Sequence, residues 1–137
     1  MPKKTLVLAA LLGLLAAARP GFAHHAFAAE YDSTKPVTLK GRLTKVEWVN
    51  PHGWIYLDIK DENGHVENWA VEFGSPNALL RRGLRKTDFP EGIEIVVKGY
   101  RAKNGTHTAN GTSVTLPDGR NLFTGSSGTG APEDGPH

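Results

Sequence analysis

Cysteine is absent from the 137-residue chain, and methionine occurs only once. A folded domain without disulfides must be held together by its apolar core, and zinc sites built on thiolates are excluded. Long hydrophobic stretches are also missing. The main apolar run, Thr5–Ala18, has 14 residues, which is short of the about 20 that a membrane-spanning helix needs.

Signatures of common hydrolases are missing as well. The chain has no cysteine nucleophile, no Gly-x-Ser-x-Gly elbow and no His-Glu-x-x-His helix. Two glutamates, Glu47 and Glu72, fall on predicted strands, where their outward-facing positions predict solvated side chains rather than a catalytic pair. We therefore predict a protein that is not an enzyme.

The first 23 residues have the pattern of a signal peptide. Lys3 and Lys4 supply a charged start, the apolar run follows, and an Arg-Pro pair ends it. We expect cleavage after Ala23, which would leave His24 as the mature amino terminus and send the protein to the periplasm or the medium. Cleavage after Ala28 is the alternative. A retained membrane anchor is disfavoured because the apolar run is short.

Removal of the signal peptide changes the charge of the chain. The full sequence holds 16 basic and 14 acidic residues, a net charge of +2. Three of the basic residues, Lys3, Lys4 and Arg19, precede residue 24, so the mature chain would hold 13 basic and 14 acidic residues, a net charge of −1. Such a chain has no general attraction for nucleic-acid phosphates, and no nucleic-acid partner is predicted.

Alternation of apolar and polar residues predicts strands from about residue 37 onward. Residues 37–43 alternate in one phase and residues 46–48 in the other. A shift of one residue within a strand indicates a β-bulge, here near Thr44 and Lys45, which would bend a long first strand.

The second and third strands are predicted to form a hairpin around the sequence Asp-Glu-Asn-Gly at residues 61–64. A two-residue turn would pair Leu57 with Ala70. A three-residue turn with Gly64 in the left-handed region pairs Leu57 with Trp69 instead. Only the second turn keeps both apolar rows on one face, so we predict it.

A short helix is predicted over Ser75–Gly83. Ser75 is expected to cap it, Pro76 to occupy its first position and Gly83 to end it. Two further strands are expected at Ile93–Tyr100 and around Ser113–Leu116, before a last short segment that ends at Phe123.

Three strands, one helix and two strands follow one another in this order. This is the order of an all-β, OB-like five-stranded barrel, in which the helix covers one end between the third and fourth strands. An open β-sandwich is the alternative, and the barrel is favoured because the helix has an obvious place in it. The domain is predicted to span residues 24–124, and the Gly- and Ser-rich residues 125–137 to form a disordered tail.

Three motifs add a resemblance. They are His-His-Ala-Phe-Ala-Ala-Glu-Tyr-Asp at residues 24–32, Val-Glu-Trp-Val-Asn-Pro-His-Gly-Trp at 46–54 and Gly-Ser-Pro-Asn-Ala-Leu-Leu-Arg-Arg-Gly at 74–83. With them the chain resembles a family of small exported bacterial proteins that is classed as a domain of unknown function. In that family a tryptophan usually follows the helix-ending glycine, and here Leu84 takes its place. The resemblance implies export and a small β fold, and it implies no activity.

Histidines at the expected mature terminus suggest a copper site. The α-amine and the imidazole of His24 can chelate one ion, and a second imidazole would complete a nitrogen set that suits Cu(II). We predict His52 as that ligand, within about 5 Å of the His24 nitrogen, because it lies in a tight Asn-Pro-His-Gly corner. His25 is the reserve ligand, because adjacent side chains of an extended chain point to opposite faces and His24 and His25 should not both act as side-chain ligands. Alternatively, the amine, the next amide and His25 could bind Cu(II) locally. In the alternative, the terminus is merely polar and His52 is a structural histidine.

The other three histidines are not predicted as ligands. His65 follows the hairpin turn, His107 lies in a polar loop that is expected to be flexible, and His137 lies in the predicted tail.

Trp54, Tyr56 and Arg101 form a second candidate site. The two aromatic residues point away from the apolar row of their strand, and Arg101 comes near the end of the fourth strand. An outer aromatic face of this kind is suited to a protein, a glycan or a lipid headgroup. Alternatively, it packs against residues 27–31. We predict a non-catalytic OB-like module that binds copper, with an interaction module as the alternative function.

Overall fold

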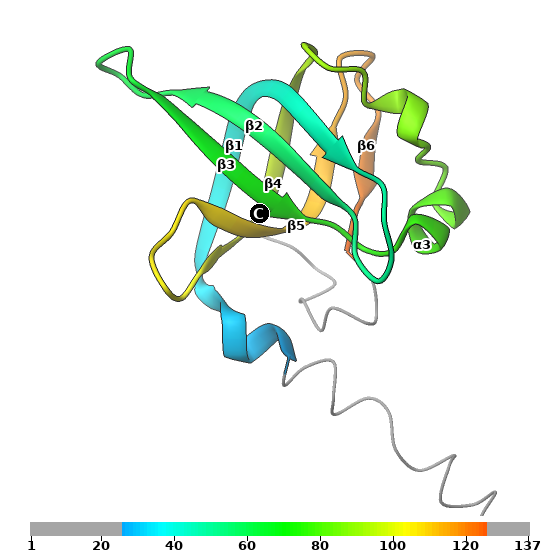
Figure 1. Ribbon diagram of the computed structural model, residues 1–137, viewed down its shortest axis with the longest axis horizontal. Helices are drawn as coiled ribbons and strands as arrows, with labels where there is room; N and C mark the ends of the chain where they lie inside the picture. Colours follow the sequence, from blue (N-terminus) through cyan, green and yellow to red (C-terminus); the bar gives the residue numbers. More distant parts are fainter. Residues whose placement is uncertain (1–25, 126–137) are drawn as a thin grey trace, which may run out of the picture.

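The computed structural model describes residues 26–125, which form a mostly β fold with a short α-helix between the third and fourth strands (Figure 1). The elements are β1 (Tyr31–Glu47), β2 (Trp54–Lys60), β3 (Val66–Glu72), α3 (Pro76–Arg81), the 3-10 turn η1 (Lys86–Asp88), β4 (Glu94–Ala102), β5 (Thr108–Thr115) and β6 (Asn121–Phe123). A helical turn at residues 26–30 precedes β1. The predicted signal peptide and nearly all of the predicted tail lie outside the described residues.

Five of the strands close into a ring. They are hydrogen-bonded in the order β3-β2-β1-β4-β5, and a parallel pairing of Ala70–Glu72 with Thr108–Asn110 joins β3 back to β5. The other pairings are antiparallel, and β6 adds to the outer edge of β5. The predicted β class with one interposed helix is confirmed, and the sheet is closed rather than open.

The bulge predicted in the first strand is confirmed. The register between β1 and β2 shifts between Leu43 and Lys45, and the hydroxyl of the intervening Thr44 donates a hydrogen bond of 3.2 Å to the Tyr56 carbonyl. The bulge lies where β1 leaves β4 and continues along β2, so one 17-residue strand serves two neighbours.

The hairpin of β2 and β3 also has the predicted register. Leu57 pairs with Trp69, and the turn closes with a hydrogen bond of 2.9 Å from the Asp61 N–H to the His65 carbonyl. Three residues lie between these two, and the last of them, Gly64, has a φ of 82°. A two-residue turn would have turned one of the apolar rows outward.

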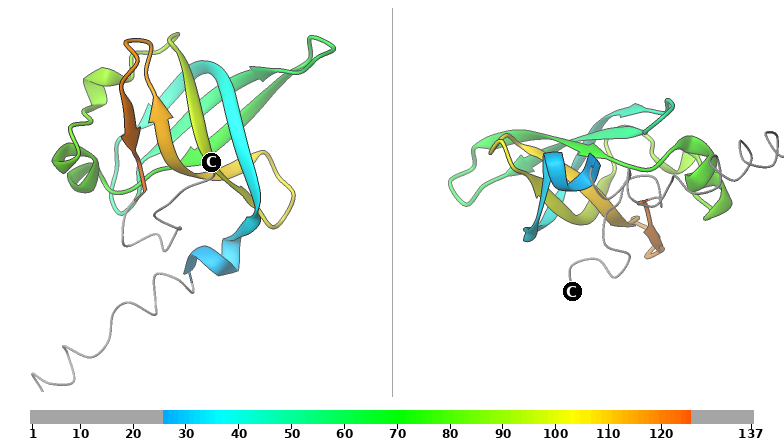
Figure 2. Two further views of the ribbon diagram at one scale, coloured as in Figure 1. Left: turned by 180° about the vertical axis from the view of Figure 1, so that it is seen from behind. Right: turned by 90° about the horizontal axis from the view of Figure 1, so that it is seen from below.

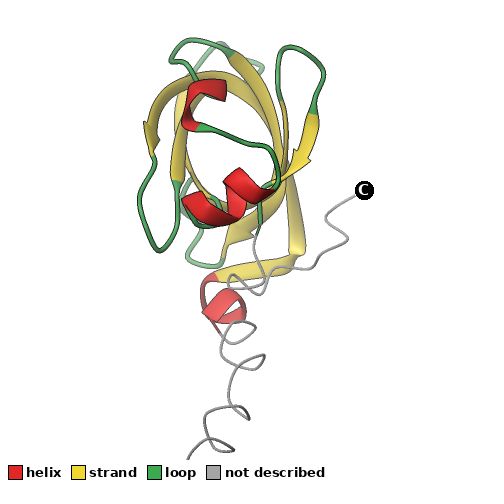
Figure 3. Ribbon diagram, turned by 90° about the vertical axis from the view of Figure 1, so that its right-hand side faces the viewer, coloured by secondary structure: helices red, strands yellow, loops and turns green. Residues whose placement is uncertain are grey.

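The helix α3 has the predicted boundaries. Ser75 Oγ accepts a hydrogen bond of 3.3 Å from the Ala78 N–H, Pro76 occupies the first position, and Gly83 follows the end of the helix with a φ of 87°. Figure 3 shows α3 and η1 lying across one opening of the ring. Buried side chains of α3, among them Leu79, extend the core into this opening.

Leu84 takes the place of the tryptophan that usually follows the helix-ending glycine in the family that the chain resembles. It is fully buried and packs in the main core cluster together with Leu79 and Phe89. A leucine therefore fills the interior position just after the helix.

Two strands extend beyond the predicted boundaries. β1 begins at Tyr31, before the alternation starts, and β5 begins at Thr108 rather than near Ser113. Asn110 and Gly111 look like turn residues, yet they pair with β4. The backbones approach closely there, since a Cβ on Gly99 would lie 2.1 Å from the Asn110 carbonyl oxygen. Glycine therefore serves close packing at this point and not chain reversal.

The segment of residues 26–31, here called the N-terminal segment, packs against the ring. Phe27 and Tyr31 are buried and form a small cluster with Tyr100 and Ala102. The Phe27 ring lies 5.7 Å from the Tyr31 ring and 5.8 Å from the Tyr100 ring. Figure 2 shows the helical turn below the ring, beside the start of β1. The Lys103 N–H donates a 2.8 Å hydrogen bond to the Glu30 carbonyl, which fastens the segment to the loop after β4.

Candidate functional site: a buried carboxylate between the N-terminal segment and the histidine corner

Glu72 is a buried carboxylate at the end of β3. Its neighbours Val71 and Phe73 face the main core, so alternation directs Glu72 to the other face of the sheet. The sequence-based prediction of a solvated side chain is wrong, because only 6% of the residue is exposed. The alternation gave the face correctly, but it could not show that Tyr31 of the N-terminal segment covers this part of it.

Two side chains contact the Glu72 carboxylate, one at each oxygen. The Tyr31 hydroxyl donates a hydrogen bond of 2.7 Å to Oε2. The Nδ1 atom of His52 lies 3.0 Å from Oε1, within reach of an ion pair or of a hydrogen bond donated by the imidazole. Glu72 therefore links the N-terminal segment to the corner between β1 and β2.

Burial dominates the acid–base properties of this group. Loss of solvation raises the pKa of Glu72, and the Tyr31 hydrogen bond and the charge of His52 lower it only in part. The pKa of Tyr31 is raised far above its ordinary value, first by burial and then by the adjacent carboxylate. Tyr31 therefore keeps its proton at neutral pH and remains a donor to Glu72.

Backbone hydrogen bonds fix the corner that carries His52. The Gly53 N–H donates to the Gly74 carbonyl at 3.0 Å, and the Phe73 N–H donates to the Gly53 carbonyl at 2.7 Å. These bonds join residues 50–53 to the end of β3, next to Glu72. These bonds and the Glu72 contact hold the His52 ring in place. One third of its side chain is exposed, so the ring remains accessible.

A hollow of about 260 Å³ lies between the corner and the N-terminal segment. It is lined by Ala26, Phe27, Glu30 and Tyr31 on one side and by His52, Trp54 and Glu72 on the other. Ala26, the first described residue, therefore shares a hollow with His52.

Of the predicted copper ligands, only His52 lies among the described residues. His24 and His25 lie outside the described residues, so the expected distance from His52 to the His24 nitrogen stays a prediction. Within residues 26–125 no group of three or more metal-ligating side chains occurs. Sequence reasoning missed Glu72 and the role of Tyr31, although Tyr31 belongs to the first motif.

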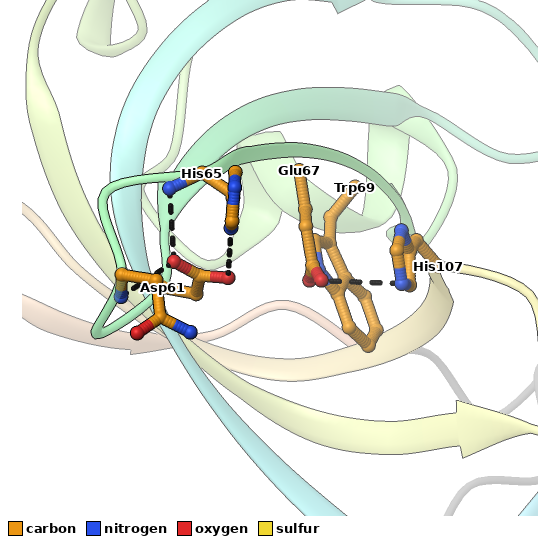
Figure 4. A network of polar contacts seen from close by, with 6 residues as sticks. Asp61, His65, Glu67, Trp69 and His107 are labelled. Carbon is orange, nitrogen blue, oxygen red and sulfur yellow. Dashed lines mark hydrogen bonds and ion pairs between the residues drawn. The ribbon is translucent and has the colours of Figure 1, made fainter.

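His65 and His107 each have a carboxylate neighbour away from the corner (Figure 4). His65 Nδ1 lies 3.3 Å from Asp61 Oδ2 at the exposed turn. His107 Nε2 lies 3.6 Å from Glu67 Oε2, and its ring stacks on Trp69 with 5.0 Å between the centroids. His107 thus packs against an aromatic residue in the loop that was expected to be flexible. His137 lies outside the described residues.

The three residues of the predicted aromatic face have different surroundings. Tyr56 contacts Glu47, with 3.2 Å from its hydroxyl to Oε2, and Lys45 lies 5.2 Å from its ring centroid. The Arg101 guanidinium lies 5.4 Å from the Trp69 ring centroid. Trp54 lines the hollow at His52, where it meets part of the N-terminal segment. Of the three, Trp54 is therefore the residue that borders the site.

Among residues 26–125, no helix is both long and apolar enough to span a bilayer. Comparison with known sequences gave one family model, described as a family of unknown function (DUF6152), which matches residues 10–112. Curated proteins and solved structures gave no match.

Proposed function

The chain belongs to this family of unknown function, and from the site itself we propose an exported, non-catalytic module that binds copper at its mature amino terminus. The signal-peptide pattern of residues 1–23 supports export. We also propose an OB-like barrel as the fold. The closure of β3 onto β5 and the position of α3 between β3 and β4 support it.

The contact between His52 and Glu72 carries the copper proposal. Histidines that bind metals commonly donate their second ring N–H to a carboxylate, which fixes the ring and its tautomer. With Nδ1 engaged by Glu72 at 3.0 Å, Nε2 of His52 is the nitrogen left to bind an ion. The arrangement supplies an oriented and partly exposed imidazole.

The chain before Ala26 can bring the other ligands. Ala26 and His52 line the same hollow, and His24 precedes Ala26 by two residues, which span at most about 7 Å. Cleavage after Ala23 would give His24 a free α-amine, and this amine and the His24 imidazole would bind the ion together with His52. Three nitrogen ligands favour Cu(II) over the hard cations. His25 remains the reserve ligand.

Titration with Cu(II) tests this proposal. We compare protein that begins at His24, checked by mass spectrometry, with the same protein acetylated at its α-amine. Acetylation converts the amine into an amide without supplying a new amine, so we expect much weaker binding. Equal affinity of the two forms would exclude the amine as a ligand, and a natural mature terminus at Ala29 would remove both histidines.

Substitutions test the contribution of the corner. His52→Ala should weaken Cu(II) binding, whereas His65→Ala, in the exposed turn, should leave it unchanged. Glu72→Gln should lower the affinity by about 10- to 100-fold, which is typical of a carboxylate that orients a metal-binding histidine. Unchanged binding in His52→Ala would contradict the proposed ligand set.

A further inference from the structure

A second, larger hollow also borders Trp54. Its volume is about 490 Å³, within the range of about 300–1,000 Å³ that is common for small-molecule sites. Its lining includes Glu30, Tyr31, Trp54, Lys103, Asn104 and Thr108. Three of these residues, Glu30, Tyr31 and Trp54, also line the hollow at His52, so the two hollows meet there.

Hydrogen bonds order the loop that forms one wall of this hollow. The Arg101 guanidinium donates a hydrogen bond of 2.9 Å to the Gly105 carbonyl. Asn104 Oδ1 accepts from the N–H and from the hydroxyl of Thr106, at 3.1 and 2.7 Å. With its Oδ1 engaged in this way, Asn104 still has an amide Nδ2 that can donate to a ligand. The wall is therefore preorganised and offers a polar group.

The charges around the hollow favour a neutral ligand. Lys103 and Glu30 contribute one positive and one negative side chain. Single-stranded nucleic acids are bound by cationic grooves that follow the phosphate backbone. Here a single lysine is offset by a glutamate, and the chain from residue 24 onward has a net charge of −1.

An indole beside amide, hydroxyl, carboxylate and ammonium groups suits a sugar. A sugar ring presents a face of C–H groups that can stack on an indole, and a rim of hydroxyls that donate and accept hydrogen bonds. The hollow lies between the start of β2 and the loop that joins β4 to β5. In OB-folds the corresponding loops border the face that binds oligonucleotides and oligosaccharides.

We propose that this hollow binds a neutral oligosaccharide, with a sugar ring stacked on Trp54 and its hydroxyls bonded to Asn104, Thr108 and Lys103. The site needs no metal and is independent of the copper proposal. The analogy with OB-folds suggests the place, while the hollow, its aromatic wall and its balanced charges indicate the class of ligand.

Binding of defined oligosaccharides to EDTA-treated mature protein tests the proposal. The probes are cellohexaose and N-acetylchitohexaose, followed by calorimetry and by the NMR signals of the tryptophan indole N–H groups. We expect at least one probe to bind and to shift the Trp54 signal more than those of Trp48 and Trp69. Trp54→Ala should weaken binding at least about tenfold, as expected for loss of a stacked aromatic ring.

Matched variants separate loss of the site from loss of the fold. Tyr56→Ala, two residues along the same strand and outside the hollow, should bind as the wild type does. Trp54→Phe should retain part of the affinity, because it keeps an aromatic face. The proposal is overturned if neither probe binds, if Trp54→Ala binds like the wild type, or if a thymidine hexanucleotide binds at Trp54 in preference to both sugars.

Discussion

Replacing Glu72 with glutamine should change how the stability of the protein depends on pH. Burial raises the pKa of Glu72 in the folded protein above the value of about 4.5 that it has in the unfolded chain. Between these two values the folded state binds more protons than the unfolded state, so stability falls as pH rises. Below about pH 4.5 this loss is absent, and above the folded pKa it is complete.

The size of the effect follows from the shift. Each pKa unit corresponds to about 1.4 kcal/mol of unfolding free energy, and Glu72→Gln removes this contribution because glutamine does not titrate. The variant also lacks one acceptor for the two donors Tyr31 and His52, which costs roughly 1.5–3 kcal/mol for a hydrogen bond to a charged group. The two effects oppose each other at neutral pH. The change with pH is therefore more informative than the stability at any single pH.

Urea unfolding followed by tryptophan fluorescence from pH 3.5 to 8 measures this change. The wild type should lose stability relative to Glu72→Gln as the pH rises above about 4.5. Glu47→Gln is the matched control. Lys45 holds the pKa of the partly exposed Glu47 below its ordinary value, so Glu47 stabilises the fold above its unfolded pKa. The wild type should therefore gain stability relative to Glu47→Gln as the pH rises, which is the opposite of the change expected for Glu72→Gln. Parallel stability curves for the wild type and Glu72→Gln would refute the argument from burial.

Two other substitutions test the fold by urea unfolding. Ser75→Ala removes the oxygen that accepts from the Ala78 N–H and should cost about 1 kcal/mol; an unchanged midpoint would show that the cap contributes nothing. Gly99→Ala places a Cβ 2.1 Å from the Asn110 carbonyl oxygen and should cost about 3 kcal/mol or more, since backbone must move. Gly64→Ala, at a φ of 82° with nothing within 4 Å, is its control and should cost only about 1–2 kcal/mol.

Local sequence rules predicted the elements that depend on neighbouring residues. The hairpin register followed from two apolar rows and one glycine, and the α3 boundaries followed from Ser75, Pro76 and Gly83. The bulge at Thr44 followed from a phase shift in the alternation. Each of these signals lies within a few residues of the structure that it specifies.

The candidate site depends on contacts between distant parts of the chain. Glu72 is buried because Tyr31, 41 positions earlier, folds over the outer face of β3. Alternation indicates which way a side chain points, but not what covers it. For the same reason β5 was predicted too short, because Gly111 leaves space for the Phe73 and Val71 side chains and does not form a turn.

Closure of the ring through β3 and β5 has a consequence for how the protein is made. The three closing residue pairs join residues 70–72 to residues 108–110, so the ring cannot close until the chain is available as far as residue 110. Until then the hydrogen-bonding groups of β3 on that side are unpaired, and such an edge can pair with another chain. Contacts between residues so far apart in sequence also slow folding. A nascent or truncated chain that ends before β5 therefore exposes a strand edge that is prone to aggregate.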